Sequence, residues 1–336
     1  MKKFAYIVLF SAASFQASAQ LDFGPILEAG STDASSYLSN YMAPLFDGLG
    51  NAMNGGWYNT AKPHKLAGFD ITFGANIAYV PDQELTWLFD NSSFTNMQLT
   101  NSSSAEVPSL FGANLDSDVL PELTFSDDDG NEILRMNALT GLGLDEVEEY
   151  PFVSSNVVPA PFVQIGFGLI KNTDIKIRLF PEREFGDASV KMFGLGIMHD
   201  FKQWIPGLSA LPLDMSAFFA FSKMTVGYVL DDTENQSLNL GIGGTTFQVV
   251  ASKKLAIFTP FVGLGFTSSN TDFNMLGNYP VGDIGSLTDP ISVEVGGASP
   301  RMSLGGRLKL AVLTLHAEYV VQKYNLLTLG AGISIR

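Results

Sequence analysis

The segment from Phe69 to Tyr79 reads FDITFGANIAY, and its apolar residues alternate with small or polar ones. Side chains along a β-strand point to opposite faces in turn, so this period of two predicts a strand with one apolar face. Pro81 lacks the backbone N–H that a strand ladder needs, and it ends the pattern. The same alternation recurs in 174–179, 213–222, 301–312, 313–322 and 327–335. The sequence therefore predicts an all-β fold.

Soluble sandwiches and membrane-spanning barrels both show alternation of this kind. Here the apolar faces run for about ten residues, which is the length that a tilted spanning strand needs. The polar faces carry full charges, as a water-filled lumen permits, and glycine is frequent on the strands. These features favour a transmembrane antiparallel β-barrel over a sandwich. A count back from the C-terminus gives about ten strands, and residues 81–160 could add more, so we expect roughly 10–14 strands, with about 12 as the best estimate.

No segment has the pattern of a membrane-spanning helix, which needs about 20 apolar residues. The longest uncharged run, 150–170, is interrupted by Pro151, Pro159 and Pro161. A chain that enters a bilayer without such helices must do so as a closed barrel, in which every backbone group is paired.

The first residues have the layout of a secretory signal peptide. Lys2 and Lys3 precede an apolar run over 4–10, and Ala17-Ser18-Ala19 provides a small-x-small cleavage site. We expect residues 1–19 to be removed near Ala19 and the mature protein to reside in the cell outer membrane, in contact with its lipid. The chain has no cysteine, so an exported fold has neither disulfides nor thiolate metal ligands.

Residues 20–66 form a second part with helical character. Between Tyr37 and Leu49 apolar residues recur at helical spacing, with Asp33 as the expected N-cap and Pro44 as an expected kink. Two placements are open, a plug inside the lumen or a helix under the barrel at the periplasmic face. The plug is favoured, although a ten-stranded barrel leaves little room for one.

The barrel itself is expected to occupy 67–336, with long outer loops at 81–160 and 267–299. The first of these loops is acidic and rich in serine and asparagine, and it contains a predicted strand over 94–99. It also contains a predicted hairpin with an Asp-Gly turn at Asp129-Gly130. The residues around that turn could instead bind calcium weakly, but the glycine is misplaced for an EF-hand loop.

The charge balance excludes one class of partner. The net charge is −15, and loss of the two lysines of the signal peptide would make the mature chain more acidic still. Nucleic-acid binding requires a basic surface, so no nucleic acid is expected as a partner. The acidity is explained by solvated loops, among them the charge run Asp145, Glu146, Glu148 and Glu149.

The search for catalytic motifs finds none. G-x-S-x-G, H-E-x-x-H, S-x-x-K and P-loop patterns are all missing from the sequence. Of the histidines His64, His199 and His316, only His316 is placed to act as a base, on a polar strand face beside Thr314 and Glu318. A solvated lumen histidine is the better interpretation. We therefore expect no enzyme activity, no cofactor and no metal.

The predicted lumen face is the polar set with most information about function. Its members carry both signs of charge, so they could form ion pairs that brace the barrel and hold the helix, or they could line a path for a solute. Bracing is favoured because small barrels fill their interiors with side chains. The candidate ligand-binding residues are Asp70, Lys176, Arg178, Arg307, Lys309 and His316, and Asp174, Asp214, Arg301 and Glu318 share the same predicted face.

Three blocks of sequence resemble a known but uncharacterised family. They are GGWYNTAKPHK at 55–65 running into Gly68-Phe69-Asp70, HDFKQWIPG at 199–207, and LTLHAEY at 313–319. They look like an outer-membrane protein family from Bacteroidota. More distantly, a helical segment ahead of a barrel is similar to the long-chain fatty-acid transporters, which import hydrophobic compounds through a plugged barrel.

The resemblance implies a barrel that passes or binds small hydrophobic solutes without catalysis. The alternative is a structural or interaction protein whose loops or N-terminal helix dock a partner. The solute, the partner and the oligomeric state are all left open by the sequence.

Overall fold

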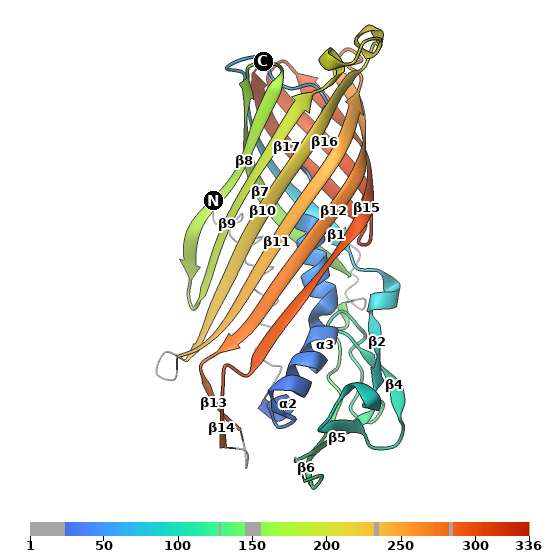
Figure 1. The fold of residues 1–336 in the computed structure, drawn as a ribbon, viewed down its shortest axis with the longest axis vertical. Coiled ribbons are helices and arrows are strands. Elements are labelled where there is room, and N and C mark those ends of the chain that lie inside the picture. Colours follow the sequence, from blue (N-terminus) through green and yellow to red (C-terminus); the bar gives the residue numbers. More distant parts are fainter. Residues whose placement is uncertain (1–23, 128, 145–155, 232–234, 282–284, 336) are drawn as a thin grey trace.

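The computed structural model describes residues 24–127, 129–144, 156–231, 235–281 and 285–335, so the predicted signal peptide and the charge run at 145–149 lie outside the described residues. The fold is a closed antiparallel barrel of ten strands, which confirms the predicted class (Figure 1). In barrel order they are β1 (Phe69–Tyr79), β17 (Leu326–Ile335), β16 (Leu313–Val321), β15 (Ile291–Leu310), β12 (Phe258–Leu276), β11 (Gln236–Ser252), β10 (Asp214–Asp231), β9 (Ala188–Asp200), β8 (Thr173–Phe185) and β7 (Val157–Leu169).

The strand number falls at the low end of the predicted range, two below the best estimate, because part of the chain between β1 and β7 forms small sheets of its own. These elements are β2 (Thr86–Asp90) paired with β4 (Ser104–Pro108), and β5 (Glu122–Ser126) paired with β3 (Met97–Leu99) and β6 (Glu132–Asn137). The pairing of β5 with β6 is the predicted hairpin. Short 3-10 turns occupy Asp82–Glu84, Asn91–Ser93, Lys202–Trp204 and Leu208–Ala210.

The two ends of the barrel differ. At one end, the upper end in Figure 1, lie the first residue of β1, the last of β17 and short turns such as 170–172 and 311–312. We call it the turn end. The other end, the loop end, carries the small sheets, and there β12 and β15 extend beyond their neighbours. The connection between them is only 277–290, with the hairpin β13 (Asn278–Val281) and β14 (Gly285–Thr288), which is shorter than the loop expected at 267–299.

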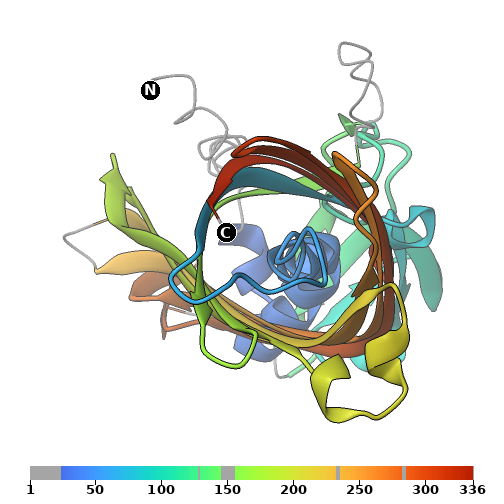
Figure 2. The same cartoon turned by 90° about the horizontal axis from the view of Figure 1, so that it is seen from above.

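The N-terminal helices enter the barrel from the loop end. They are α2 (Gly24–Leu27) and α3 (Gly30–Met53), and Figure 2 shows the helix within the ring of strands. α3 contacts β1, β7, β11, β12 and β15. The C-terminal half of the helix therefore lies inside the barrel as a plug. Pro44 lies inside the helix without ending it.

Two glycines explain how so narrow a barrel accommodates a helix. A Cβ at Gly48 would lie 2.6 Å from the side chain of Val158 on β7, and one at Gly50 would lie 2.5 Å from that of Ser269 on β12. Real side chains do not approach this closely, so the helix backbone sits against the wall at both points. The expectation that ten strands leave little room overlooked this approach.

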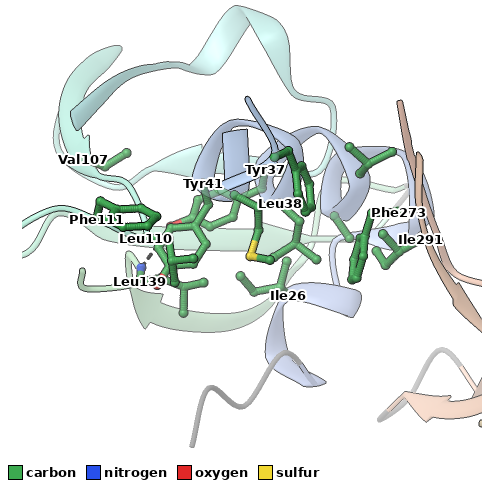
Figure 3. Packing of buried hydrophobic residues seen from close by; sticks show 14 of the residues in the cluster. Ile26, Tyr37, Leu38, Tyr41, Val107, Leu110, Phe111, Leu139, Phe273 and Ile291 are labelled. Carbon is green, nitrogen blue, oxygen red and sulfur yellow. Dashed lines mark hydrogen bonds between the residues drawn. The ribbon is translucent and has the colours of Figure 1, made fainter. Parts of the chain in front are cut away.

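The first half of α3 packs outside the ring, against the small sheets. Figure 3 shows Tyr37, Leu38 and Tyr41 among buried side chains from the chain between β1 and β7, such as Leu110 and Leu139, and from β12 and β15, which contribute Phe273 and Ile291. The hydroxyl of Tyr41 donates to the carbonyl of Thr140 at 2.8 Å. Asp33 is not the N-cap, which is Ala29. Its carboxylate instead accepts the backbone N–H groups of Thr95 and Asn96 at 2.9 and 2.6 Å.

The outer face of the barrel is apolar. Side chains such as Leu264 (58% exposed), Leu304 (63%) and Phe247 (50%) point away from the lumen and are open to the surroundings. Soluble monomers rarely expose apolar surface on this scale, whereas a barrel in a bilayer presents such a band to lipid. Among the described residues, no helix is both long and apolar enough to cross a membrane.

We predict that Gly48→Val weakens the fold by about 1–3 kcal/mol, because the added side chain collides with Val158 where helix and wall touch. Thermal unfolding of the purified protein, followed by heat-modifiable gel migration, measures the loss. Thr32→Val, at an exposed position of the same helix, is the control and should unfold at nearly the wild-type temperature. Equal unfolding temperatures for Gly48→Val and wild type would mean that the helix is not held against β7.

Candidate functional site

The predicted lumen residues do point into the barrel. Asp70, Lys176, Arg178, Arg307 and His316 are each no more than 6% exposed, and Lys309 is partly buried. The structure does not collect them into one pocket. They divide instead between two levels of the segment that follows α3, residues 54–64, which runs through the lumen towards the turn end.

The first level surrounds His64, near the turn end. Its ring Nδ1 lies 2.9 Å from Oδ2 of Asp174, and its backbone N–H donates to Oδ1 of the same carboxylate at 2.7 Å. Nε2 lies 3.4 Å from a carboxylate oxygen of Asp70, and Lys176 Nζ is within 3.9 Å of both carboxylates. From the sequence, His64 is only one of three histidines. Its role depends on strand pairing far along the chain, for which one sequence carries no signal.

Ser334 completes a serine, histidine and aspartate arrangement at this level, with Oγ 3.4 Å from His64 Nε2. The group resembles a hydrolase triad in composition, but its surroundings differ. Asp70 approaches the same ring nitrogen, Lys309 Nζ lies 3.2 Å from the serine Oγ, and Ser334 is only 3% exposed. A nucleophile needs access to its substrate and a base reserved for its proton. The contacts fit a buried brace better.

The second level surrounds Arg178, which is 1% exposed. Its guanidinium donates to the carbonyls of Met53 at 3.2 Å and Gly55 at 2.7 Å, and Nε donates to Gln164 at 3.1 Å. The rings of Trp57 and Phe162 lie 3.9 and 4.1 Å from its central carbon. Met53 is the last residue of α3, so the cation satisfies carbonyl groups at the negative end of the helix.

Further contacts fix the residues just after the helix. Glu318 accepts the backbone N–H of Gly56 at 3.3 Å, and Arg301 approaches the same carboxylate at 3.9 Å. The hydroxyl of Tyr58 donates to Gln248 at 2.6 Å. These contacts favour the bracing interpretation for most of the predicted lumen residues. His316 is different, because neither of its ring nitrogens has a hydrogen-bond partner among the described atoms.

The candidate calcium turn uses its carboxylate internally. Asp127 accepts the backbone N–H of Asn131 at 2.7 Å and its side-chain amide at 2.9 Å, and the backbone N–H of Asp129 at 3.0 Å. The hydrogen bonds from Asn131 hold the pKa of Asp127 below its usual range. The described part of the turn therefore has the geometry of a self-contained loop.

The barrel wall changes between β7 and β8. These strands pair only from Gln164 opposite Arg178 down to Leu169 opposite Thr173, although both continue towards the loop end. The unpaired edges, 157–163 of β7 and 179–185 of β8, are called the slot.

Prolines account for the end of the pairing. The backbone groups of Asn156 and Gly168 form hydrogen bonds to residues at the two ends of β1, and the register between these points is unbroken. The backbone N–H and C=O groups of even-numbered residues of β7 therefore point to β1, and those of odd-numbered residues point to β8. Pro159 and Pro161 therefore lack an N–H on the edge towards β8. Continuation of the β7–β8 register would place Pro161 opposite Pro181, and neither residue can donate.

An apolar pocket of about 120 Å³ lies at the slot. It is lined by residues whose side chains face the lumen, such as Phe162 and Met192, and by residues whose side chains face outward, such as Val163 and Leu179. Leu49 and Met53 of α3 form its inner side. Its two polar side chains are engaged elsewhere: the Arg178 contacts are given above, and the amide of Asn76 donates to the carbonyl of Ala52 at 2.8 Å. Such a cavity favours an apolar occupant.

The slot lies at the loop-end edge of the apolar outer band. Leu179 and Phe193 are 58% and 45% exposed, and directly beyond them come the exposed charged residues Glu182, Arg183 and Lys191. From the sequence, Pro159 and Pro161 exclude a spanning helix, but the slot itself is not predicted. Proline clusters on a predicted barrel strand are the signal that could have found it.

We predict that Arg178→Met lowers stability by about 3 kcal/mol, because it leaves the helix carbonyls and Gln164 without their charged partner. The heat-modifiable gel shift of the purified protein should move to lower temperature. Arg183→Met removes the same charge from an exposed position and should have little effect. The same shift in both variants would refute a special role for the buried arginine.

Comparison with known proteins identifies the family. The chain belongs to the "Family of unknown function (DUF6588)", whose model matches residues 1–335. This agrees with the resemblance to an uncharacterised family. Its assignment to Bacteroidota and the relation to fatty-acid transporters stay predictions. No curated protein matches the chain.

Solved structures show only distant similarity. The translocator domain of the autotransporter NalP from Neisseria meningitidis is 9% identical, with 91% of this chain and 98% of that chain covered and a TM-score of 0.31. The attachment invasion locus protein Ail of Yersinia pestis is 9% identical, with 80% and 99% covered and a TM-score of 0.27. At such scores neither structure bears on function.

Proposed function

We propose that this member of the family of unknown function is an outer-membrane barrel that binds small hydrophobic molecules at the slot and passes them through the wall without catalysis. The observation that carries the proposal is the apolar pocket between β7, β8 and α3, lined by residues from both faces of the wall. A molecule dissolved in the bilayer can reach such a pocket without crossing water. The distant resemblance to hydrophobic-compound transporters points the same way.

The plug supports a lateral route over an aqueous one. α3 and the segment after it occupy the lumen, and His64, Arg178 and Glu318 fix that segment to the wall. An open channel for polar solutes would require those contacts to break. The slot needs no such rearrangement, because its edges carry no pairing to disrupt. We therefore expect the purified protein in planar bilayers to show no steady conductance.

We predict that Ala160→Phe weakens binding of a hydrophobic fluorophore by about tenfold or more, because the ring fills the pocket that Ala160 lines. N-phenyl-1-naphthylamine, titrated into the detergent-purified protein, reports binding by its fluorescence. Ala317→Phe adds the same bulk at an exposed position on β16 and should bind as wild type does. Unchanged binding by Ala160→Phe would show that the pocket is not the binding site.

The route itself can be tested by bridging the slot. The chain has no native cysteine, so the pair Val163→Cys and Leu179→Cys can be joined by a bifunctional thiol reagent. We predict that this cross-link abolishes uptake of a labelled aromatic hydrocarbon by cells, because it closes the gap. The pair Ile165→Cys and Ile177→Cys, already opposite each other in the paired ladder, is the control and should leave uptake unchanged. Full uptake through the bridged slot would exclude the lateral route.

A further inference from the structure

The turn end of the barrel carries lysines beside exposed apolar side chains. Three neighbouring pairs share this composition, each in or next to a turn: Lys65 with Leu66, Ile170 with Lys171, and Lys254 with Leu255. Leu66 is 68% exposed, Ile170 65% and Leu255 49%, and all three lysines are exposed. We call these six residues the collar.

The collar continues the lipid-facing band. Leu169 next to Ile170, and Phe258 close after Leu255, are exposed on the outer face at 38% and 42%. Exposed apolar side chains in a turn are costly in water, but they are stable where the band meets the bilayer interface. The first two turns are neighbours, because the backbone N–H of Ala67 donates to the carbonyl of Gly168 at 3.1 Å. The collar therefore lies at the margin of the membrane.

The collar is basic on a strongly acidic chain. The net charge is −15, yet the nearby described carboxylates are already engaged: Asp214 pairs with Lys62 at 3.7 Å, and Asp200 accepts the backbone N–H of Lys202 at 2.9 Å. Exposed acidic residues such as Asp116 and Glu132 lie among the loop-end sheets instead. The two ends of the molecule thus have opposite charge character.

We propose that the collar binds the anionic headgroups of the phospholipid leaflet that faces the turn end. Leu66, Ile170 and Leu255 enter the boundary between acyl chains and headgroups. The lysine stems follow them, so that each ammonium group reaches the phosphate level. The collar sets the depth of the barrel in the bilayer, and with it the height of the slot. This binding does not depend on the proposed passage of hydrophobic molecules.

The test is lipid selection by the full-length protein in nanodiscs of mixed phosphatidylglycerol and phosphatidylcholine. Native mass spectrometry after mild release counts the lipids that stay bound. We expect wild type to retain phosphatidylglycerol preferentially. Lys171→Glu combined with Lys254→Glu should cut that preference by about tenfold, because each cation near an anionic surface contributes a several-fold effect. Raising the salt concentration should reduce the wild-type preference, since exposed charges are screened.

Arg183→Glu combined with Lys223→Glu makes the same change in charge at exposed positions away from the turn end, and it should keep the wild-type preference. Loss of preference in both double variants would overturn the proposal, since net charge alone would then explain selection. A wild-type preference that does not respond to salt would overturn it too, and that measurement needs no variant to fold. An unchanged lipid preference in Lys171→Glu combined with Lys254→Glu would also overturn the proposal.

Discussion

A barrel wall in lipid must pair its backbone N–H and C=O groups with neighbouring strands, because hydrocarbon offers them no other partner. Closure of β1 onto both β7 and β17 removes the free edges of an open sheet, although β15 extends past the end of β16 and pairs with it only over Met302–Leu310. The boundary between β7 and β8 meets the demand only from Gln164 to Leu169 of β7. Prolines on both strands withdraw donors where β7 and β8 separate, so the unpaired stretch is written into the sequence. It begins where the apolar band ends, which limits the cost of leaving backbone groups unpaired.

The plug answers a second demand, which is that a narrow lumen be filled. Gly48 and Gly50 bring the helix backbone against opposite parts of the wall. At the C-terminal end of the helix, Arg178 donates from β8 to the carbonyl of Met53, the last helical residue, and to that of Gly55 just beyond it. The same residue begins the slot, as the last member of β8 still paired with β7. Arg178 therefore both caps the helix and marks the end of the slot that is nearer the turn end. This couples the position of the plug to the shape of the pocket.

Alternation along single strands was enough to predict the barrel and the inward direction of Asp70, Lys176 and Arg178, because strand period is a local property. The number of strands was harder, since the sheets between β1 and β7 have the same local patterns as barrel strands. Contacts between distant segments could not be predicted at all. His64 meets Asp174 across 110 positions of the chain, and nothing in the composition around either residue specifies that pairing. The slot had a readable cause in its prolines, but the cause has meaning only once the register of β7 is known.

The lumen charges also show why a polar interior need not be a path. At the two levels around His64 and Arg178, residues such as Asp174, Arg178 and Glu318 bond to the segment that they enclose, and a buried cation or carboxylate is tolerable only with such partners. A solute path through the same space would have to replace those partners at every step. An apolar pocket in the wall makes no such demand, because the polar side chains in its lining, Asn76 and Arg178, keep their partners when a hydrophobic molecule enters. The division of labour follows from this difference: charged residues hold the plug, and the apolar slot is left as the part of the barrel that can exchange its contents.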